Sequence, residues 1–386
     1  MSSIPRAETV GSLLRPDYVR DMRAGVRSGF VSQTQRREVE DRAVLEAIAL
    51  QEGAELDVIT DGELRRVSWI ATAPTTVEGL HRAAFSGFKV LQDAGPGWIR
   101  FWWDNQGNFI QRGNRPRGVV VEKIAFANDI TAEYAFLKAH ATRRTKFCLP
   151  SPSYHRIYWD RNYSRDAYPS SREFLYDVAD KLREHVLKPL LALGCDYVQL
   201  DAPNYGQFYV DPAVRTAYET EDHEDMAANL IEDAEVDNYF FEGTAGITSA
   251  MHVCRGNSPG GYWSANGGYE ALAPLFARIP HIDTLLLEYD TPRAGDFGPL
   301  RHILPGTNVV LGLLTTKEGE MEDAAEVEAR VREASEFIPL ERLALSTQCG
   351  FASAEGGNPV TPEQQMAKLH MVQQVATKVW ASQASA

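Results

Sequence analysis

The hydrophobic positions of this chain form short, continuous runs that are separated by longer segments with a helical pattern of apolar and polar residues. Most of the short runs are apolar at every position, which is typical of parallel strands buried on both faces. The predicted strands are Glu8–Leu13, Leu56–Thr60, Thr145–Leu149, Tyr197–Leu200, Thr248–Val253, Thr284–Glu288, Asn308–Leu314 and Leu343–Ser346.

The segments between these runs predict helices at Arg36–Gln51, Ser171–Leu193, Asp222–Ala234, Tyr269–Ala277, Glu322–Phe337 and Pro362–Trp380. Ser171 suits a helix cap, and Pro362 suits the first position of a helix. About eight strands that alternate with helices predict an α/β fold, the (β/α)₈ TIM barrel. A doubly wound sheet is the alternative, but no Gly-x-Gly-x-x-Gly motif follows an early strand.

Residues 80–125 break the alternation. The runs Gly97–Trp103 and Gly118–Val121, with the turn-like Asp104–Asn108 between them, predict antiparallel strands. We interpret this segment as a β-hairpin insertion that covers the active site or makes a subunit contact. Residues 1–386 are then a single catalytic barrel domain that carries the insertion within it.

Composition and charge narrow the function. The chain is 44% hydrophobic, which is enough for a large core. Its net charge of −14 and its lack of a basic block argue against nucleic acid and anionic membranes as partners. No signal-like segment or membrane-length apolar run is present, so we expect a cytoplasmic protein that acts on small molecules, with a homo-oligomer left open.

The chain has four cysteines, too few for a disulfide framework in a protein of this size. Cys148 and Cys195 lie in apolar surroundings and are interpreted as small buried residues. Cys254 and Cys349 instead lie where two strand-like runs end in polar or small residues.

Two further candidate ligands accompany these cysteines. His252 lies two residues before Cys254 on one strand, so both side chains face the same way, and Glu288 ends the next run. The carboxyl ends of barrel strands share one mouth, where two thiolates, an imidazole and a carboxylate can hold Zn²⁺ tetrahedrally. Because Zn²⁺ deprotonates a coordinated thiol, ligation rich in cysteine favours thiol alkylation over hydrolysis.

Five motifs across the chain resemble the catalytic C-terminal half of cobalamin-independent methionine synthase. They are closer still to its short single-barrel relatives, which include epoxyalkane:coenzyme M transferases. The motifs are Val10-Gly11-Ser12-Leu13-Leu14-Arg15-Pro16, Asp61-Gly62-Glu63-Leu64-Arg65-Arg66, Gln199-Leu200-Asp201-Ala202-Pro203, His252-Val253-Cys254 and Gln348-Cys349-Gly350-Phe351. The resemblance implies a (β/α)₈ barrel with catalytic zinc on His252, Cys254, Glu288 and Cys349.

The resemblance also implies substrate contacts. Ser12 would bind the carboxylate of homocysteine, and Glu63 and Asp201 would bind its amino group through charge-assisted hydrogen bonds. The alternative for Glu63 is an exposed carboxylate that pairs with a neighbouring arginine. The alternative for Asp201 is a helix or turn cap.

Two departures from the methionine synthase pattern concern the donor. Lys317 stands where the family has a histidine that is thought to protonate the leaving folate. A buried lysine with a lowered pKa can donate a proton, whereas an exposed one would form a surface ion pair. The folate-binding N-terminal half of the long enzymes is absent, which argues against methyltetrahydrofolate as the donor.

The expected function is therefore zinc-dependent S-methyl or S-alkyl transfer to homocysteine or a similar amino-acid thiol. The first alternative is alkyl transfer to another thiol, such as coenzyme M in epoxide opening, with Arg255 and Arg15 near enough to bind a sulfonate. The acidic residues 63 and 201 disfavour it, because they would repel a sulfonate. A metal-free barrel of the uroporphyrinogen decarboxylase type is weaker still, because it needs no thiolate ligands.

Overall fold

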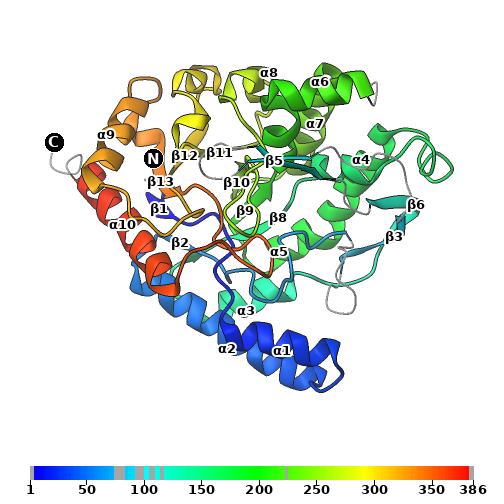
Figure 1. Ribbon diagram of the computed structural model, residues 1–386, viewed down its shortest axis with the longest axis horizontal. Helices are drawn as coiled ribbons and strands as arrows, with labels where there is room; N and C mark the ends of the chain where they lie inside the picture. The colour runs from blue at the N-terminus through cyan, green and yellow to red at the C-terminus, as the bar shows by residue number, and fades with distance from the viewer. Residues whose placement is uncertain are drawn as a thin grey trace.

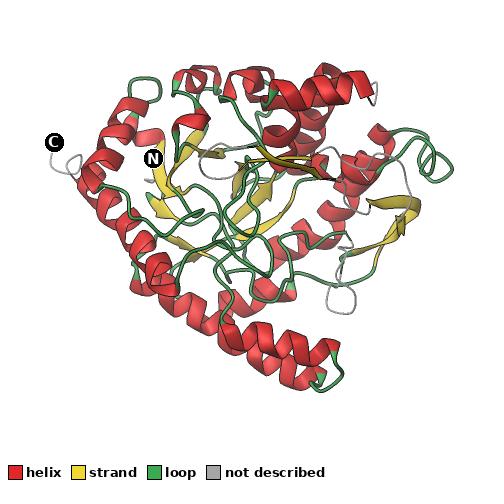
Figure 2. Ribbon diagram, viewed as in Figure 1, coloured by secondary structure: helices red, strands yellow, loops and turns green. Residues whose placement is uncertain are grey.

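The computed structural model describes residues 4–73, 83–91, 100–103, 109–113, 117–221 and 225–381. Its centre is a sheet of nine strands whose neighbours all run parallel, in the order β7-β2-β1-β13-β12-β11-β10-β9-β8. The helices surround this sheet (Figures 1 and 2). The strands are β1 (Ala7–Glu8), β2 (Val58–Ile59), β7 (Arg144–Thr145), β8 (Phe147–Pro150), β9 (Tyr197–Asp201), β10 (Thr248–Val253), β11 (Thr284–Glu288), β12 (Asn308–Leu314) and β13 (Leu343–Thr347).

The sheet closes into a barrel because β7 and β8, which follow each other in the chain, together fill the place between β2 and β9. β7 and β8 are separated only by Lys146. On one side Thr145 pairs with Ile59 of β2, and on the other Phe147 pairs with Val198 of β9. The last strand, β13, pairs with the first, β1. The predicted (β/α)₈ barrel is therefore confirmed.

The alternation of side chains along each strand separates two cores. On β11, Leu285 and Leu287 belong to the large core that includes the helices, whereas Leu286 belongs to a small cluster of inward-facing residues. This inner cluster consists of Val10, Val58, Tyr197, Ala250, Leu286, Val310 and Ala344. By the same alternation Glu288 faces inward with Leu286, and His252 faces inward with Ala250. The packing of the barrel therefore decides which strand-end side chains meet.

The helices are α1 (Asp17–Arg27), α2 (Gln33–Gly53), α3 (Ala132–His140), α4 (Ser171–Leu182), α5 (Lys188–Ala192), α6 (Pro212–Glu221), α7 (Met226–Phe241), α8 (Ala273–Phe276), α9 (Ala324–Ala334) and α10 (Pro362–Ala381). Sequence patterning missed α1, α3 and α6. Residues 222–224, where one predicted helix begins, lie outside the described part of the chain.

The long helix predicted from residue 171 to 193 is present over residues 171–192, but it contains a π-helical turn. α4 begins at Ser171, but its cap is Ser170, whose side chain accepts a hydrogen bond from the backbone of Glu173. A π-helical turn, η2 (Arg183–Leu187), separates α4 from α5. Pro189 explains the interruption, because a proline has no N–H for the helical ladder.

The first predicted strand is also shorter than expected. Only Ala7–Glu8 pair as β1, although the apolar run continues to Leu13. Beyond β1 the backbone bonds to loops: Leu13 N–H donates to Gly62 (3.0 Å), and Ser12 accepts from Phe351 N–H (2.8 Å). The segment that contains Gly11 and Ser12 therefore crosses between the loops that follow β2 and β13.

The insertion consists of antiparallel strands, as predicted, but their pairing differs. β3 (Phe85–Leu91) pairs with β6 (Arg117–Phe126), and β4 (Arg100–Trp103) pairs with β5 (Phe109–Gly113). The expected turn at 104–108 lies outside the described residues. Trp103 stacks on Trp263 with ring centroids 5.1 Å apart, and the two backbones exchange hydrogen bonds of 3.0 and 3.1 Å. β4 therefore docks on the loop after β10.

Short 3₁₀ and π turns fill several connections: η1 (Ser153–Tyr158), η3 (Tyr205–Val210), η4 (Tyr269–Leu272), η5 (Pro292–Ala294), η6 (Gly298–His302) and η7 (Leu340–Arg342). Among the described helices, none combines the length and the apolar character that crossing a bilayer requires.

Candidate metal centre and substrate site

Four strand-end side chains meet inside the barrel mouth. His252 lies on β10, Cys254 directly follows that strand, Glu288 ends β11, and Cys349 follows β13. All four are buried, and one ligand atom from each lies within 4.8 Å of the others. The four residues that the sequence selected as zinc ligands are therefore brought together as one cluster.

The ligand atoms of this cluster lie close together, and those of His252 and Glu288 lack hydrogen-bond partners. The Sγ atoms of Cys254 and Cys349 are 3.7 Å apart, and His252 Nε2 is 3.9 Å from Glu288 Oε1. His252 Nδ1 lies 3.3 Å from the carbonyl of Leu286, so a proton on Nδ1 leaves the lone pair on Nε2. His252 Nε2 and both carboxylate oxygens of Glu288 are buried and have no hydrogen-bond partner. Buried polar atoms without partners are costly, and a bound cation would satisfy all three.

The two thiols differ in acidity. A hydrogen bond from Cys254 lowers the pKa of Cys349 well below its ordinary value, and the same bond raises the pKa of Cys254. Burial would lower the pKa of His252, but the adjacent Cys349 and the nearby carboxylates raise it to about 9. The cluster thus stabilises thiolate character at Cys349, which is the form that binds a metal.

A second cluster lies beside the first. Ligand atoms of Glu63, Cys148 and Asp201 lie within 4.8 Å of one another, and all three residues are buried. Asp201 is the register neighbour of His252 across β9 and β10, so the two clusters adjoin. Burial raises the pKa of both carboxyl groups, and their mutual repulsion adds to the effect for Glu63. This cluster is short of positive charge.

The turn that precedes Glu63 fixes where its carboxylate lies. Gly62 and Glu63 both adopt left-handed backbone, with φ of 69° and 55°. The side chain of Asp61 accepts a hydrogen bond from Glu63 N–H at 2.9 Å. Glu63 Oε1 is 3.9 Å from Arg66 Nη1, and Glu63 Oε2 has no partner. Glu63 is therefore not the exposed carboxylate of the alternative interpretation.

Gly11 and Ser12 lie between the two clusters. A Cβ on Gly11 would lie 3.0 Å from Glu63 Oε1, and a Cβ on Gly350, next to Cys349, would lie 2.1 Å from Ser12 Oγ. Ser12 is buried. A side chain on Gly350 would overlap Ser12, and one on Gly11 would crowd the Glu63 carboxylate. Ser12 therefore lies beside the turn that carries Cys349.

Lys317 is buried rather than exposed, which removes the surface ion pair considered from the sequence. Its Nζ donates to the carbonyl of Gly256 (2.8 Å) and to Asn257 Oδ1 (3.2 Å), on the loop after Cys254. Burial lowers its pKa, and the negative charge of Glu288 works against that shift.

Arg255 and Arg15 donate hydrogen bonds to backbone carbonyls of loops in this structure. Arg255 Nη2 donates to the carbonyls of Ala265, Gly267 and Arg293, and it is buried. Arg15 donates to the carbonyls of Ala352 and Arg66. Neither guanidinium joins the two clusters.

Sequence reasoning missed several residues of the site. Cys148 is buried, as expected, but it lies among the acidic side chains rather than in an apolar pocket. Arg66 donates to the carbonyl of Cys148 and approaches Glu63. Arg293 lies 3.7 Å from Glu288 and over the ring of Trp263. For Cys148 a signal existed, since it lies near a strand end, two residues after an inward-facing lysine.

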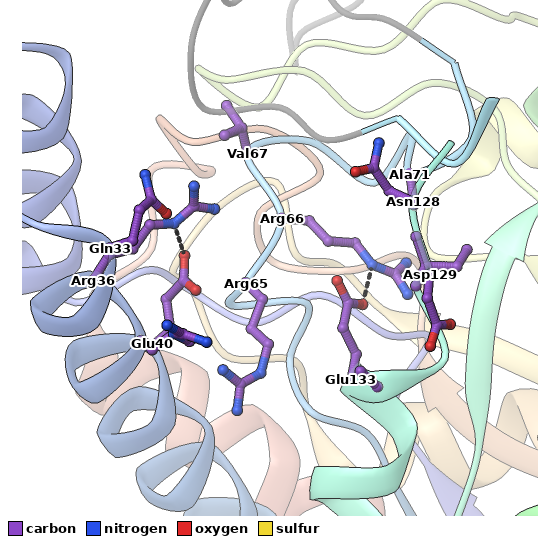
Figure 3. A pocket seen from close by; sticks show the side chains of 13 residues that line it. Gln33, Arg36, Glu40, Arg65, Arg66, Val67, Ala71, Asn128, Asp129 and Glu133 are labelled. Carbon is purple, nitrogen blue, oxygen red and sulfur yellow. Dashed lines mark hydrogen bonds and ion pairs between the residues drawn. The ribbon is translucent and has the colours of Figure 1, made fainter. Parts of the chain in front are cut away.

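A separate cavity of about 500 Å³ lies beside Arg65 and Arg66 (Figure 3). α2, the loop after β2 and the start of α3 line it. Its charges largely pair with one another: Arg36 with Glu40 (2.8 Å) and Arg66 with Glu133 (2.7 Å). Arg66 therefore forms both the inner wall of this cavity and the edge of the acidic cluster.

Comparison with known proteins agrees with this geometry. The family described as the catalytic domain of cobalamin-independent synthase matches residues 6–377. The uncharacterized protein YxjH of Bacillus subtilis is 33% identical over 97% of this chain and 94% of its own length. A methionine synthase of Saccharolobus solfataricus is 23% identical over 91% of this chain and 90% of its own. A structure of a B12-independent methionine synthase from Shewanella sp. W3-18-1, in complex with selenomethionine, is similar in fold over 100% of both chains, with a TM-score of 0.70 and 21% identity.

Proposed function

Because the chain belongs to the catalytic-domain family of cobalamin-independent methionine synthases, we propose that it is a zinc-dependent thiol alkyltransferase. Its reaction would be transfer of a methyl group to homocysteine or a similar amino-acid thiol. The methionine synthase name of the Saccharolobus relative and the selenomethionine bound by the Shewanella protein both support an amino-acid thiol.

The observation that carries the proposal is the convergence of four ligand side chains, in which His252 Nε2 and both Glu288 oxygens have no hydrogen-bond partner. The residues fit zinc, because two thiolates bound tetrahedrally at about 2.3 Å would lie about 3.8 Å apart. Cys254 and Cys349 already lie 3.7 Å apart. His252, Cys254, Glu288 and Cys349 would hold the ion. When bound, Zn²⁺ lowers the pKa of a substrate thiol and keeps it as a nucleophilic thiolate at neutral pH.

The acidic cluster would bind the amino group of the substrate. Glu63 and Asp201 are buried carboxyl groups that lack a full counterion, so an ammonium group between them would stabilise both in the charged form. Ser12 would receive the substrate carboxylate. The spacing supports a short substrate, because Asp201 is the register neighbour of the metal-cluster residue His252.

In the transfer step the thiolate sulfur would attack the methyl carbon of the donor. The new S–C bond forms as the bond from carbon to the leaving group breaks, and the leaving group takes the electron pair and then a proton. We propose Lys317 as the proton donor. Burial lowers the pKa of Lys317, which eases release of that proton.

Coenzyme M is the weaker substrate candidate. Its sulfonate would approach the buried carboxyl groups of Glu63 and Asp201, and like charges at short range repel. Arg15, one of the two arginines that would have to bind the sulfonate, donates to backbone carbonyls instead. Arg255 does so through Nη2, whereas its Nε and Nη1 have no partner. A metal-free barrel would leave the buried ligand atoms of His252 and Glu288 without a partner.

The test is alkylation of two thiols by the zinc-loaded protein, followed by mass spectrometry. Homocysteine and coenzyme M are each paired with several methyl and alkyl donors. The proposal expects an S-methyl product from homocysteine and none from coenzyme M. Alkylation of coenzyme M alone, or of neither thiol, would overturn it.

A further inference from the structure

A buried chain of polar side chains leads from the barrel interior to Asp201. Lys146 Nζ donates to Glu8 Oε2 (2.5 Å) and to Gln199 Oε1 (2.7 Å). Gln199 Nε2 donates to Asp201 Oδ1 (2.7 Å) and to the carbonyl of Val10 (2.9 Å). Lys146, Gln199 and Glu8 are at most 2% exposed. This hydrogen-bond network therefore connects Glu8, Lys146 and Gln199 to the carboxylate of Asp201.

The chemistry of these groups allows only one orientation of the Gln199 amide. An ammonium group has only donors, so Gln199 Oε1 must face Lys146. A backbone carbonyl has only acceptors, so Nε2 must face Val10. The second hydrogen on Nε2 is then directed at Asp201. Consequently, Asp201 Oδ1 can only accept at this contact.

We propose that Lys146 and Gln199 are positioning residues that hold the Asp201 carboxylate as a hydrogen-bond acceptor for the ammonium group of the substrate. This inference rests on the proposed function, because it assumes a substrate with an amino group. It adds that selectivity for an amino-acid thiol over a plain thiol depends on residues that the substrate does not touch.

Glu8 completes the arrangement by balancing the charge of Lys146. Its two carboxylate oxygens accept from Tyr197 OH at 3.1 Å, and one of them also accepts from Lys146. A buried ion pair becomes costly when one partner is removed, because the other charge stays buried alone. A variant that removes Lys146 must therefore remove the charge of Glu8 as well.

The test uses two variants of the zinc-loaded protein, Gln199→Leu and the double variant Glu8→Gln/Lys146→Met. Binding of homocysteine and of 4-sulfanylbutanoate, which lacks the amino group, is measured by calorimetry, together with kcat and KM for homocysteine. We expect both variants to bind homocysteine about tenfold more weakly, as loss of one hydrogen bond to a charged group predicts. Affinity for 4-sulfanylbutanoate and the zinc content should stay unchanged, and kcat should change far less than KM.

Gln51→Leu is the matched control. Gln51 is a buried glutamine whose amide donates to the carbonyls of Ala47 and Thr60 and accepts from Thr60 N–H, away from Asp201. It should lower thermal stability without changing the preference between the two thiols. Equal weakening of both thiols in the Gln199 variant, or an unchanged preference in both site variants, overturns the inference.

Different outcomes would disprove the proposed amine-binding function and the proposed role of Lys146 and Gln199. If the wild-type protein itself shows no preference for homocysteine over 4-sulfanylbutanoate, the proposed amine-binding function is wrong. If the wild type shows the preference and both variants keep it, only the role of Lys146 and Gln199 is wrong. Should Gln199→Leu not fold, the double variant decides between these outcomes, because it keeps Gln199 and removes both charges of the ion pair.

Discussion

Two groups of buried ionisable side chains in this barrel differ in how their atoms are paired. In the network around Asp233 and Asp237 every carboxylate oxygen accepts hydrogen bonds. Asp237 accepts from Ser153 and Tyr205 at 2.6–2.9 Å, and Asp233 accepts from Arg156 and Tyr209 and from Asn204 (2.6–3.2 Å). In the metal-centre cluster, His252 Nε2 and both oxygens of Glu288 accept none.

Burial and shifted pKa values do not separate these regions, because burial raises the pKa of both Asp237 and Glu288. Pairing does. The fully paired carboxylates of Asp233 and Asp237 tie η1, η3 and α7 together and need no further partner. The unpaired atoms of His252 and Glu288 are costly unless a ligand supplies what is missing. We therefore interpret the first region as structural and the second as a binding site.

The largest expected effect tests the unsaturated cluster. Cys349→Ser should reduce bound zinc from about one ion per chain to less than about a tenth, because a serine hydroxyl is a poor zinc ligand. Alkyl transfer should fall by more than about a thousandfold with it. Elemental analysis and product formation measure the two losses.

Cys195→Ser is the control for that variant. Cys195 is buried and contacts the carbonyl of Tyr197 at the other end of β9, so zinc and activity should persist. Full zinc content in Cys349→Ser would show that the ligand set is wrong.

Lys317 has features of both regions. Its Nζ has hydrogen-bond partners, as the atoms of the structural network do, but it lies beside the metal centre. If Lys317 is the proton donor, Lys317→Met should lower kcat about a hundredfold while the zinc content stays normal. Single-turnover rates in the zinc-loaded variant measure this. A normal kcat with a lowered melting temperature would assign Lys317 to the structural class.

Asp201 sharpens the comparison at the acidic cluster. Asp201→Asn removes one charge that would face the substrate ammonium, so KM for homocysteine should rise about tenfold or more. The des-amino thiol 4-sulfanylbutanoate should be bound as in the wild type. An equal loss for both thiols would mean that Asp201 maintains the shape of the site and does not recognise the amine.

The smallest effect concerns the structural network. Burial raises the pKa of Asp237 to about 7, above the value of about 3.9 for an unfolded chain. The folded state therefore holds a proton that the unfolded state has lost between these values, and stability should fall as the pH rises from about 4 to about 7.

Asp237→Asn should flatten this dependence without altering alkyl transfer. Urea unfolding at pH 5 and at pH 7.5 compares the two proteins. An unchanged pH dependence, or a loss of activity in a folded variant, would contradict the structural interpretation.

The sequence predicted what depends on local pattern. The strands were visible because β9, β10, β11, β12 and β13 are almost wholly buried, so they are apolar along most of their length. The four candidate metal ligands were visible because they lie near the carboxyl ends of such strands or just after them. α1 was missed because few of its residues are apolar, although Val19, Met22 and Val26 do have helical spacing.

What the sequence did not predict depends on contacts between distant segments. Lys146 and Gln199 look like ordinary polar residues inside apolar strands, and their bond to each other joins different strands. Cys148 looked apolar because its neighbours in sequence are, whereas its neighbours in space are Glu63 and Asp201. Docking of Trp103 on Trp263 joins the insertion to the loop after β10, which no local pattern reveals.

The most direct test of the central claim is X-ray absorption at the zinc edge of the protein purified without oxygen. The account predicts about one zinc per chain with two sulfur ligands at about 2.3 Å and two lighter ligands, nitrogen and oxygen, at about 2.0–2.2 Å. Adding homocysteine should bring a third sulfur to the metal. A protein that binds no zinc, or whose zinc has no sulfur ligands, would contradict the assignment of His252, Cys254, Glu288 and Cys349 as its metal centre.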